Sequence, residues 1–245
     1  MFNFFTDNAS INGKFNISGS DFNHIKNVLR MKIGEKFLVS HGGASHLCEL
    51  ESFESDFVVA KIFEENYQDT SLPIEIYLFQ GLPKADKLEL IIQKTVELGV
   101  HEIIPVEMKR SIVKLDEKKK DSKTTRWQAI AESAAKQSKR TAIPTVQSAI
   151  PYTKALEMSK DLDLLLIPYE SKNGMTDTAN ALKQIKAGMK VGVIIGPEGG
   201  FEESEIQKAE ELNGKAISLG KRILRTETAA IATITMLMLY SEMSL

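Results

Sequence analysis

The chain has 245 residues, of which 42% are hydrophobic and 26% charged, a composition typical of a globular protein with one large or two small cores. Its longest apolar stretch, 229–240, is too short to cross a bilayer, and the amino terminus lacks a secretory signal, so we expect a cytoplasmic protein without a membrane partner. The net charge of −2 taken alone argues against a nucleic-acid partner, and a single cysteine excludes an intramolecular disulfide.

The amino-terminal region is predicted to form a small β-rich domain. Three short runs have the composition of strands: 35–40, 45–53 and 56–63. Gly42-Gly43 is a hairpin signal between the first two runs, and one short helix is expected up to Arg30, with Ser20 or Asp21 as its N-cap. The polar stretch 64–72 is interpreted as a linker.

His41, His46 and Cys48 lie close together in this region and have nucleophilic or metal-binding chemistry. Their spacing matches no standard metal site, so we expect no metal. Cys48 alternates with apolar neighbours and is therefore interpreted as a buried, inert thiol.

From Ile74 onward, strands alternate with helices, which predicts a mostly parallel α/β sheet. Strands are expected over these ranges: 74–80, 101–106, 162–167, 191–195 and 217–219. Helices are expected over these: 85–98, 122–139, 176–186, the residues after Phe201, and 226–240. We place a first domain over 1–68 and a second over 73–245. The last helix is apolar around much of its circumference, which favours burial inside the domain or in a dimer.

Two segments near the carboxyl terminus share a plan of strand, glycine-bearing loop and helix. They are Val191–Phe201 (VGVIIGPEGGF) and Ile217–Ala229 (ISLGKRILRTETA), with Thr226 as the expected N-cap of the helix that follows. Two such loops at the carboxyl ends of parallel strands form the usual crevice for a small ligand. Neither matches a phosphate-binding P-loop or a dinucleotide fingerprint, which argues against ATP hydrolysis and nicotinamide chemistry.

These segments resemble the RsmE family of knotted SPOUT methyltransferases. Further motifs carry the resemblance in the same order along the chain: His24–Arg30 (HIKNVLR), Lys94–Gly99 (KTVELG) and Gln137–Arg140 (QSKR). The resemblance implies a SPOUT sheet with a carboxyl-terminal trefoil knot, preceded by a PUA-like RNA-binding barrel, in a homodimer. It also implies S-adenosylmethionine-dependent methylation of uridine N3 in 16S (small-subunit) ribosomal RNA. One departure is Asn3, which stands where the family usually has an arginine.

The resemblance implies that three loops hold S-adenosylmethionine through backbone groups, glycines and apolar side chains. The residues expected to contact it are Leu166, Ile167, Pro168, Ile195, Gly196, Pro197, Glu198, Gly199, Gly200, Leu219, Gly220, Ile223, Leu224 and Thr228.

For the acceptor, Arg225 is expected to stabilise charge on the uracil carbonyl oxygens, because guanidinium is permanently ionised and fork-shaped. Either Glu198 or Glu227 is a candidate base if burial raises its pKa, although each also has a purely structural interpretation.

An RNA partner is further favoured by the charge distribution. Residues 109–140 carry 11 basic and 4 acidic side chains, a local charge of +7 that is typical of a phosphate-binding surface. The side chains expected to contact RNA are Arg30, Lys32, Lys84, Lys87, Lys94, Lys136 and Arg140.

Two other functions remain open from sequence. One is a SPOUT enzyme that methylates a ribose 2′-hydroxyl, and the other is a ribosome assembly factor that binds RNA without catalysis.

Overall fold

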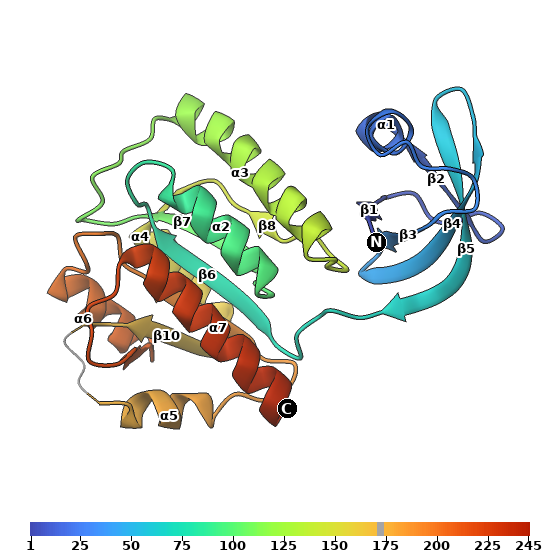
Figure 1. The fold of residues 1–245 in the computed structure, drawn as a ribbon. Helices are drawn as coiled ribbons and strands as arrows, with labels where there is room; N and C mark the ends of the chain where they lie inside the picture. Colours follow the sequence, from blue (N-terminus) through green and yellow to red (C-terminus); the bar gives the residue numbers. More distant parts are fainter. Residues whose placement is uncertain (171–173) are drawn as a thin grey trace. The chain divides into compact units, whose positions relative to one another are not determined.

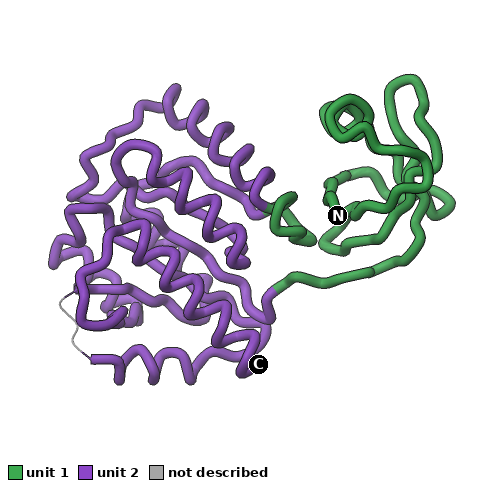
Figure 2. Tube along the Cα trace, in the orientation of Figure 1, with its two compact units in different colours: residues 1–71, 135–143 green, residues 72–134, 144–245 purple. Residues whose placement is uncertain are grey.

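A computed structural model describes residues 1–170 and 174–245. The chain forms two compact units (Figure 2). Unit 1 comprises residues 1–71 and 135–143, and unit 2 comprises residues 72–134 and 144–245. The expected domains, 1–68 and 73–245, differ from these units chiefly in the segment 135–143.

Unit 1 is a curled five-stranded sheet with one short helical segment (Figure 1). Its elements are β1 (Asn3–Phe5), β2 (Lys14–Ser18), α1 (Gly19–Asn23), the π-helical turn η1 (His24–Val28), β3 (Lys36–His41), β4 (Ala44–Phe53) and β5 (Phe57–Gln68). The strand order is β1-β3-β4-β5-β2, and only the β1–β3 pair is parallel. Phe4, Phe15 and Phe37 are almost fully buried in its core together with Cys48. Burial raises the pKa of Cys48 to about 12, as expected for an inert thiol.

Several local predictions for unit 1 are corrected by the structure. The hairpin at Gly42-Gly43 is confirmed, with φ values of 57° and 83° that suit glycine. The short strands β1 and β2 were not expected. The first helix begins at Gly19 after Ser18, whose side chain makes no capping hydrogen bond, so neither Ser20 nor Asp21 is the N-cap. The expected linker is shorter than predicted, because β5 continues to Gln68.

The segment 135–143 belongs to unit 1 through side-chain contacts. Asn3 Nδ2 donates a hydrogen bond to the Arg140 carbonyl over 3.0 Å, and Lys136 Nζ pairs with Asp21 Oδ1 at 2.9 Å. The Asn3 side chain also accepts a hydrogen bond from Ser40 Oγ at 3.0 Å. Asn3 therefore has a structural function in unit 1.

Unit 2 is a seven-stranded parallel sheet, as the alternation of strands and helices predicted. Its strands are β6 (Glu75–Gly81), β7 (Glu102–Glu107), β8 (Thr145–Val146), β9 (Ile150–Pro151), β10 (Leu164–Pro168), β11 (Lys190–Ile195) and β12 (Lys215–Ile217). The order is β12-β10-β11-β6-β7-β8, and β9 pairs with β7. Every pair is parallel.

Helices cover both faces of this sheet (Figure 1). They are α2 (Lys87–Glu97), α3 (Glu117–Gln137, whose last turn lies in unit 1), α4 (Tyr152–Met158), the 3₁₀ turn η2 (Ser159–Asp161), α5 (Thr176–Leu182), α6 (Glu203–Glu211) and α7 (Thr226–Ser244). Helices α2 and α7 pack side by side over β6 and β11. On the other face, Phe79, Leu165 and Ile194 form one core with apolar side chains of α4 and α6. The strands are therefore buried on both faces, which explains their nearly continuous apolar runs.

Further observations complete the comparison with the sequence. Helix α4 was not expected, and Thr226 is the first residue of α7, whose N-cap is Arg225. The trefoil knot stays a prediction. None of the described helices is long and apolar enough to cross a membrane. In the same residues, no three His, Cys, Asp or Glu side chains lie together as a metal site would require.

Candidate functional site

A cavity of about 430 Å³ lies in unit 2 at the carboxyl ends of β10, β11 and β12. Two segments form most of its wall: the first loop, residues 196–202, follows β11, and the second loop, residues 218–225, follows β12 and leads into α7. Pro168 and Tyr169 at the end of β10 complete it. The site therefore lies at the sheet edge that the strand pattern indicated.

Most of the residues expected to contact the cofactor line this cavity. They are Pro168, Ile195, Gly196, Pro197, Glu198, Gly200, Leu219, Gly220, Ile223 and Leu224. Leu166 and Ile167 do not line it, because both side chains are fully buried in the interior of the sheet. Gly199 and Thr228 are exposed outside it. A Cβ on Gly199 would lie 2.9 Å from Arg110 Cβ, so this glycine allows the close approach of another segment.

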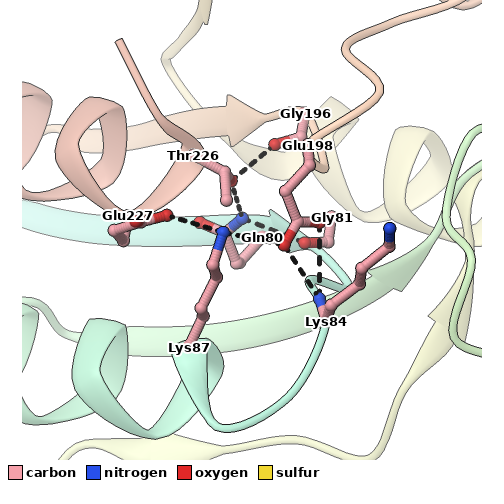
Figure 3. Close-up of polar contacts among 8 residues, drawn as sticks. All are labelled: Gln80, Gly81, Lys84, Lys87, Gly196, Glu198, Thr226 and Glu227. Atoms are coloured by element: carbon pink, nitrogen blue, oxygen red, sulfur yellow. Dashed lines mark hydrogen bonds and ion pairs between the residues drawn. The ribbon is translucent and has the colours of Figure 1, made fainter.

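A chain of buried hydrogen bonds lies beside the cavity (Figure 3). Gln80 Nε2, at the end of β6, donates to the Gly81 carbonyl at 3.0 Å and to Thr226 Oγ1 at 2.9 Å. Thr226 Oγ1 in turn donates to the Gly196 carbonyl at 2.7 Å. These bonds join β6, the first loop and the first residue of α7.

Nearer the surface, ion pairs join the first residue of α2 to the first loop and to α7 (Figure 3). Lys87 Nζ lies 3.0 Å from Glu198 Oε1 and 3.5 Å from Glu227 Oε2, and the backbone N–H of Lys84 donates to Glu198 Oε1 at 3.0 Å. Burial by itself raises the pKa of Glu198, but hydrogen bonds from its own backbone, Lys87 and Lys84 outweigh burial and leave the pKa below its ordinary value. The hydrogen bond with Glu198 raises the pKa of Lys87. Both groups are therefore ionised at neutral pH.

The far side of the first loop is tied to the segment after β7. Arg110 donates from Nε to Glu202 Oε1 at 2.8 Å and from Nη1 to the Gly199 carbonyl at 3.1 Å. The nearly buried Glu205 accepts from the backbone N–H of Lys109 at 3.0 Å and forms a capping box with Glu202 at the start of α6. The loop is thus fixed at both ends.

The second loop is fixed only at its ends. The Thr178 hydroxyl, on α5, donates to the Ser218 carbonyl at 2.8 Å and accepts from its N–H at 3.1 Å. Gly220 has a φ of +104°, a conformation that favours glycine. Within the described residues, no hydrogen bond or ion pair involves residues 221–224. Ile223 is 85% exposed, although it is a large apolar side chain on the cavity wall.

Sequence reasoning missed several residues of the wall. They are Lys87, Glu170, Ser218, Thr226 and Ala229, while Tyr169, Phe201, Lys221 and Arg222 lie within the three loops expected to hold the cofactor. Lys87 was expected to contact RNA, and its position at the start of the helix after β6 gave no sign that it pairs with Glu198 in the loop after β11. Of the three residues expected to act in catalysis, Arg225 and Glu198 line the cavity. Glu227 does not line it, and its carboxylate lies 3.5 Å from Lys87 Nζ.

The residues expected to contact RNA fall in both units. Arg30 and Lys32 are exposed in unit 1. Lys136 and Arg140 lie in the segment 135–143, where burial lowers the pKa of Arg140 to about 10.

Lys84, Lys87 and Lys94 belong to unit 2, and Lys94 pairs with Glu97 at 2.8 Å. Within the basic stretch 109–140, several basic side chains form ion pairs in the described part of the chain, among them Arg110, Lys119, Lys120, Arg126 and Lys136. The local charge of +7 is therefore partly neutralised by acids from elsewhere in the chain.

Comparisons with known proteins agree with the fold and the cavity. A family model described as an RNA methyltransferase domain matches residues 70–238, and one described as an RNA methyltransferase PUA domain matches residues 17–63. The chain is 39% identical to ribosomal RNA small subunit methyltransferase E of Bacillus subtilis over 94% of this chain and 91% of that protein. It is 36% identical to the protein of the same name from Mesomycoplasma hyopneumoniae, over 96% and 98%.

A solved structure of the Neisseria gonorrhoeae protein of that name, bound to S-adenosylmethionine, is 33% identical with a TM-score of 0.81 over 96% of both chains. A methyltransferase from Legionella pneumophila in complex with the same cofactor is 28% identical, also with a TM-score of 0.81 over 96% of both chains. Because the family model spans more than half of the chain and these similarities extend over nearly all of it, the chain belongs to the ribosomal RNA small subunit methyltransferase E (RsmE) family.

Proposed function

We propose that this chain transfers a methyl group from S-adenosylmethionine to N3 of a uridine in the 16S RNA of the small ribosomal subunit. The observation that carries the proposal is the cavity built from two glycine-bearing loops at the carboxyl ends of adjacent parallel strands. Family membership and the cofactor-bound relatives support the same activity.

The cavity fits S-adenosylmethionine in size and in chemistry. Its volume of about 430 Å³ lies within the ordinary range of small-ligand sites. Leu219, Ile223 and Leu224 offer apolar surface for a purine, while Gly196 and Gly220 leave the backbone accessible to its polar edge. A Cβ on Gly196 would lie only 3.2 Å from the Phe201 ring, so glycine also allows this ring to pack closely against the loop backbone.

For the acceptor, the side chains must hold a uracil and stabilise its anion. The bound cofactor supplies a methyl group on a sulfonium, and transfer requires the acceptor nitrogen to be held in line with it. Arg225 lines the cavity directly before α7 and is assigned to the uracil carbonyl oxygens, on which negative charge develops when the N3 proton leaves.

Neither glutamate has the properties of the expected base. The pKa of Glu198 is lowered rather than raised, and Lys84 and Lys87 already donate to its carboxylate. Glu227 does not line the cavity. We therefore assign both to the stabilisation of the site. The N3 proton passes to solvent, and the rate of methyl transfer is expected to increase with pH while uracil is still largely protonated.

The proposal includes RNA binding, a homodimer, the trefoil knot and a cytoplasmic location. Exposed cations support RNA contact: Arg30 and Lys32 in unit 1, and Lys84 beside the cavity. A homodimer is supported by the outer face of α7, where an apolar hollow includes Leu239 and Met243, exposed by 47% and 81%. A Met243→Lys variant is expected to shift the molecular mass measured by light scattering towards that of the monomer.

The activity is tested with small subunits that lack the modification, labelled S-adenosylmethionine and mapping of the labelled nucleotide. A methyl group on uridine N3 is the expected result. A methyl group on a ribose hydroxyl would contradict the proposed specificity. Cofactor binding without transfer would point to a different RNA substrate, and absence of cofactor binding would favour the assembly-factor alternative.

A further inference from the structure

The buried hydrogen-bond chain at the end of β6 has a fixed direction. Gln80 is fully buried, and its amide lies near the Gly81 carbonyl, which can only accept a hydrogen bond. The Nε2 side of the amide must therefore face this carbonyl and Thr226 Oγ1. Oε1 points elsewhere and has no hydrogen-bond partner among the described residues.

This direction determines the state of the Thr226 hydroxyl. The hydroxyl has one proton, and because it accepts from Gln80, that proton is available for the Gly196 carbonyl at 2.7 Å. Thr226 is only 5% exposed, so water does not readily replace either bond. The hydrogen bond that Thr226 accepts from Gln80 therefore orients the one that it donates to Gly196.

These hydrogen bonds connect the first loop, which forms a wall of the cofactor site, to the residue that follows Arg225. Gly196 is the first residue of the first loop, and Thr226 follows Arg225 directly. One hydroxyl therefore sets the distance between the wall of the cofactor site and the backbone that carries the arginine assigned to the acceptor.

We propose that Gln80 and Thr226 are positioning residues: they hold the first loop and Arg225 in one fixed relation, so that cofactor and acceptor meet in line. This inference rests on the proposed function for its kinetic part. Its binding part, the affinity for S-adenosylmethionine, is independent of the RNA substrate.

The main test uses Thr226→Val, which keeps the shape and removes the hydroxyl, and Thr226→Ser, which keeps the hydroxyl. For Thr226→Val we expect the Kd for S-adenosylmethionine, measured by calorimetry, to increase about tenfold, because two buried groups lose their partner. We also expect kcat at saturating cofactor to decrease. Thr226→Ser should bind within about twofold of the original protein, since both hydrogen bonds remain.

Thr233→Val is the matched control. Thr233 lies in the same helix, is fully buried, and donates to the carbonyl of Ala229 within the helix at 2.7 Å. The substitution is chemically identical but lies outside the cavity wall. A general loss of helix stability would lower Tm in both variants, whereas only Thr226→Val should change the Kd and kcat.

Gln80→Met is a second variant, which removes the donor to Thr226 instead of the Thr226 hydroxyl. Methionine has a similar shape and no donor, while Thr226 can still donate to Gly196, so we expect an increase in Kd of about threefold. If Thr226→Val does not fold, this variant and Thr226→Ser decide the question.

The inference would be overturned if Thr226→Val or Gln80→Met bound S-adenosylmethionine as tightly as Thr233→Val. That result is distinct from failure of the proposed function, in which the original protein binds the cofactor and methylates no ribosomal RNA.

Discussion

The two loops that line the cavity are held in different ways. The first loop receives hydrogen bonds from three other segments, through Thr226, Arg110 and the backbone of Lys84. In the described chain, residues 221–224 of the second loop have none, and Ile223 is mostly exposed. The first loop is thus formed before any ligand binds, whereas the middle of the second loop has few interactions until a ligand covers its apolar side chains. We therefore expect the first loop to be a preorganised wall and the second loop to become ordered on binding.

The largest effect is expected from the end of the second loop. Arg225→Ala should lower kcat by about 10²–10³-fold, the usual loss when a group that stabilises developing charge is removed. Because we assign the cofactor to apolar and backbone groups of the cavity, the Kd for S-adenosylmethionine should change little. Arg222→Ala, a neighbouring cation on the same loop, is the control. Equal losses of kcat in the two variants would contradict a special function for Arg225.

The contrast between the loops can be tested by proteolysis. The second loop has tryptic sites at Lys221, Arg222 and Arg225, and we expect trypsin to cut it in the free protein. Saturating S-adenosylmethionine, at about 100 times its Kd, should slow this cleavage by at least tenfold, because the ordered loop resists the protease. The cleavage sites are identified by mass spectrometry. Rapid cleavage that the cofactor does not slow would show that the second loop is not ordered on binding.

A smaller effect is expected for Glu198→Gln, which removes the ion pair with Lys87. Because the folded pKa of Glu198 lies below its ordinary value of 4.5, the carboxylate stabilises the protein above that pH, and the stabilisation is lost as the pH falls through the folded pKa. The difference in Tm between the original protein and Glu198→Gln should therefore be largest at neutral pH and disappear in acid. A difference that is independent of pH would show that the ion pair does not stabilise the first loop.

The smallest effect is expected for Arg110→Ala. The Arg110 and Glu202 side chains are 46% and 39% exposed, so solvent screens their ion pair and it should contribute little to the free energy of unfolding. Lys119→Ala, which removes a more exposed pair with Asp116, is the control. A substantially larger loss in urea unfolding for Arg110→Ala alone would show that the hydrogen bond to the Gly199 carbonyl, not the ion pair, fixes the first loop.

Local sequence predicted most of the architecture because it depends on short-range patterns. Continuous apolar runs such as 191–195 predicted strands buried on both faces, and glycines after them predicted loops at one sheet edge. The cavity lies at that edge. The short strands β1 and β8 and the helix α4 were missed, since a few residues have too little periodicity to be recognised.

Predictions about individual side chains were less successful wherever the partner is distant in sequence. Threonine is a common N-cap residue, yet the Thr226 hydroxyl donates a hydrogen bond to the carbonyl of Gly196, thirty residues away in the sequence. The ion pairs of Lys87 with two glutamates from later segments were likewise not expected, and its contact with RNA stays a prediction.

The sequence by itself determined the family, the strand and helix pattern, and the two loops that carry the site, because motifs and periodicity are local properties of the chain. Only the tertiary structure decided which charges remain available, which segment completes unit 1, and that Gln80 supports the cavity. Those outcomes depend on the folding of β6, β11 and α7 beside one another, and the partners that hydrogen bonds and ion pairs acquire there cannot be identified from spacing along the chain.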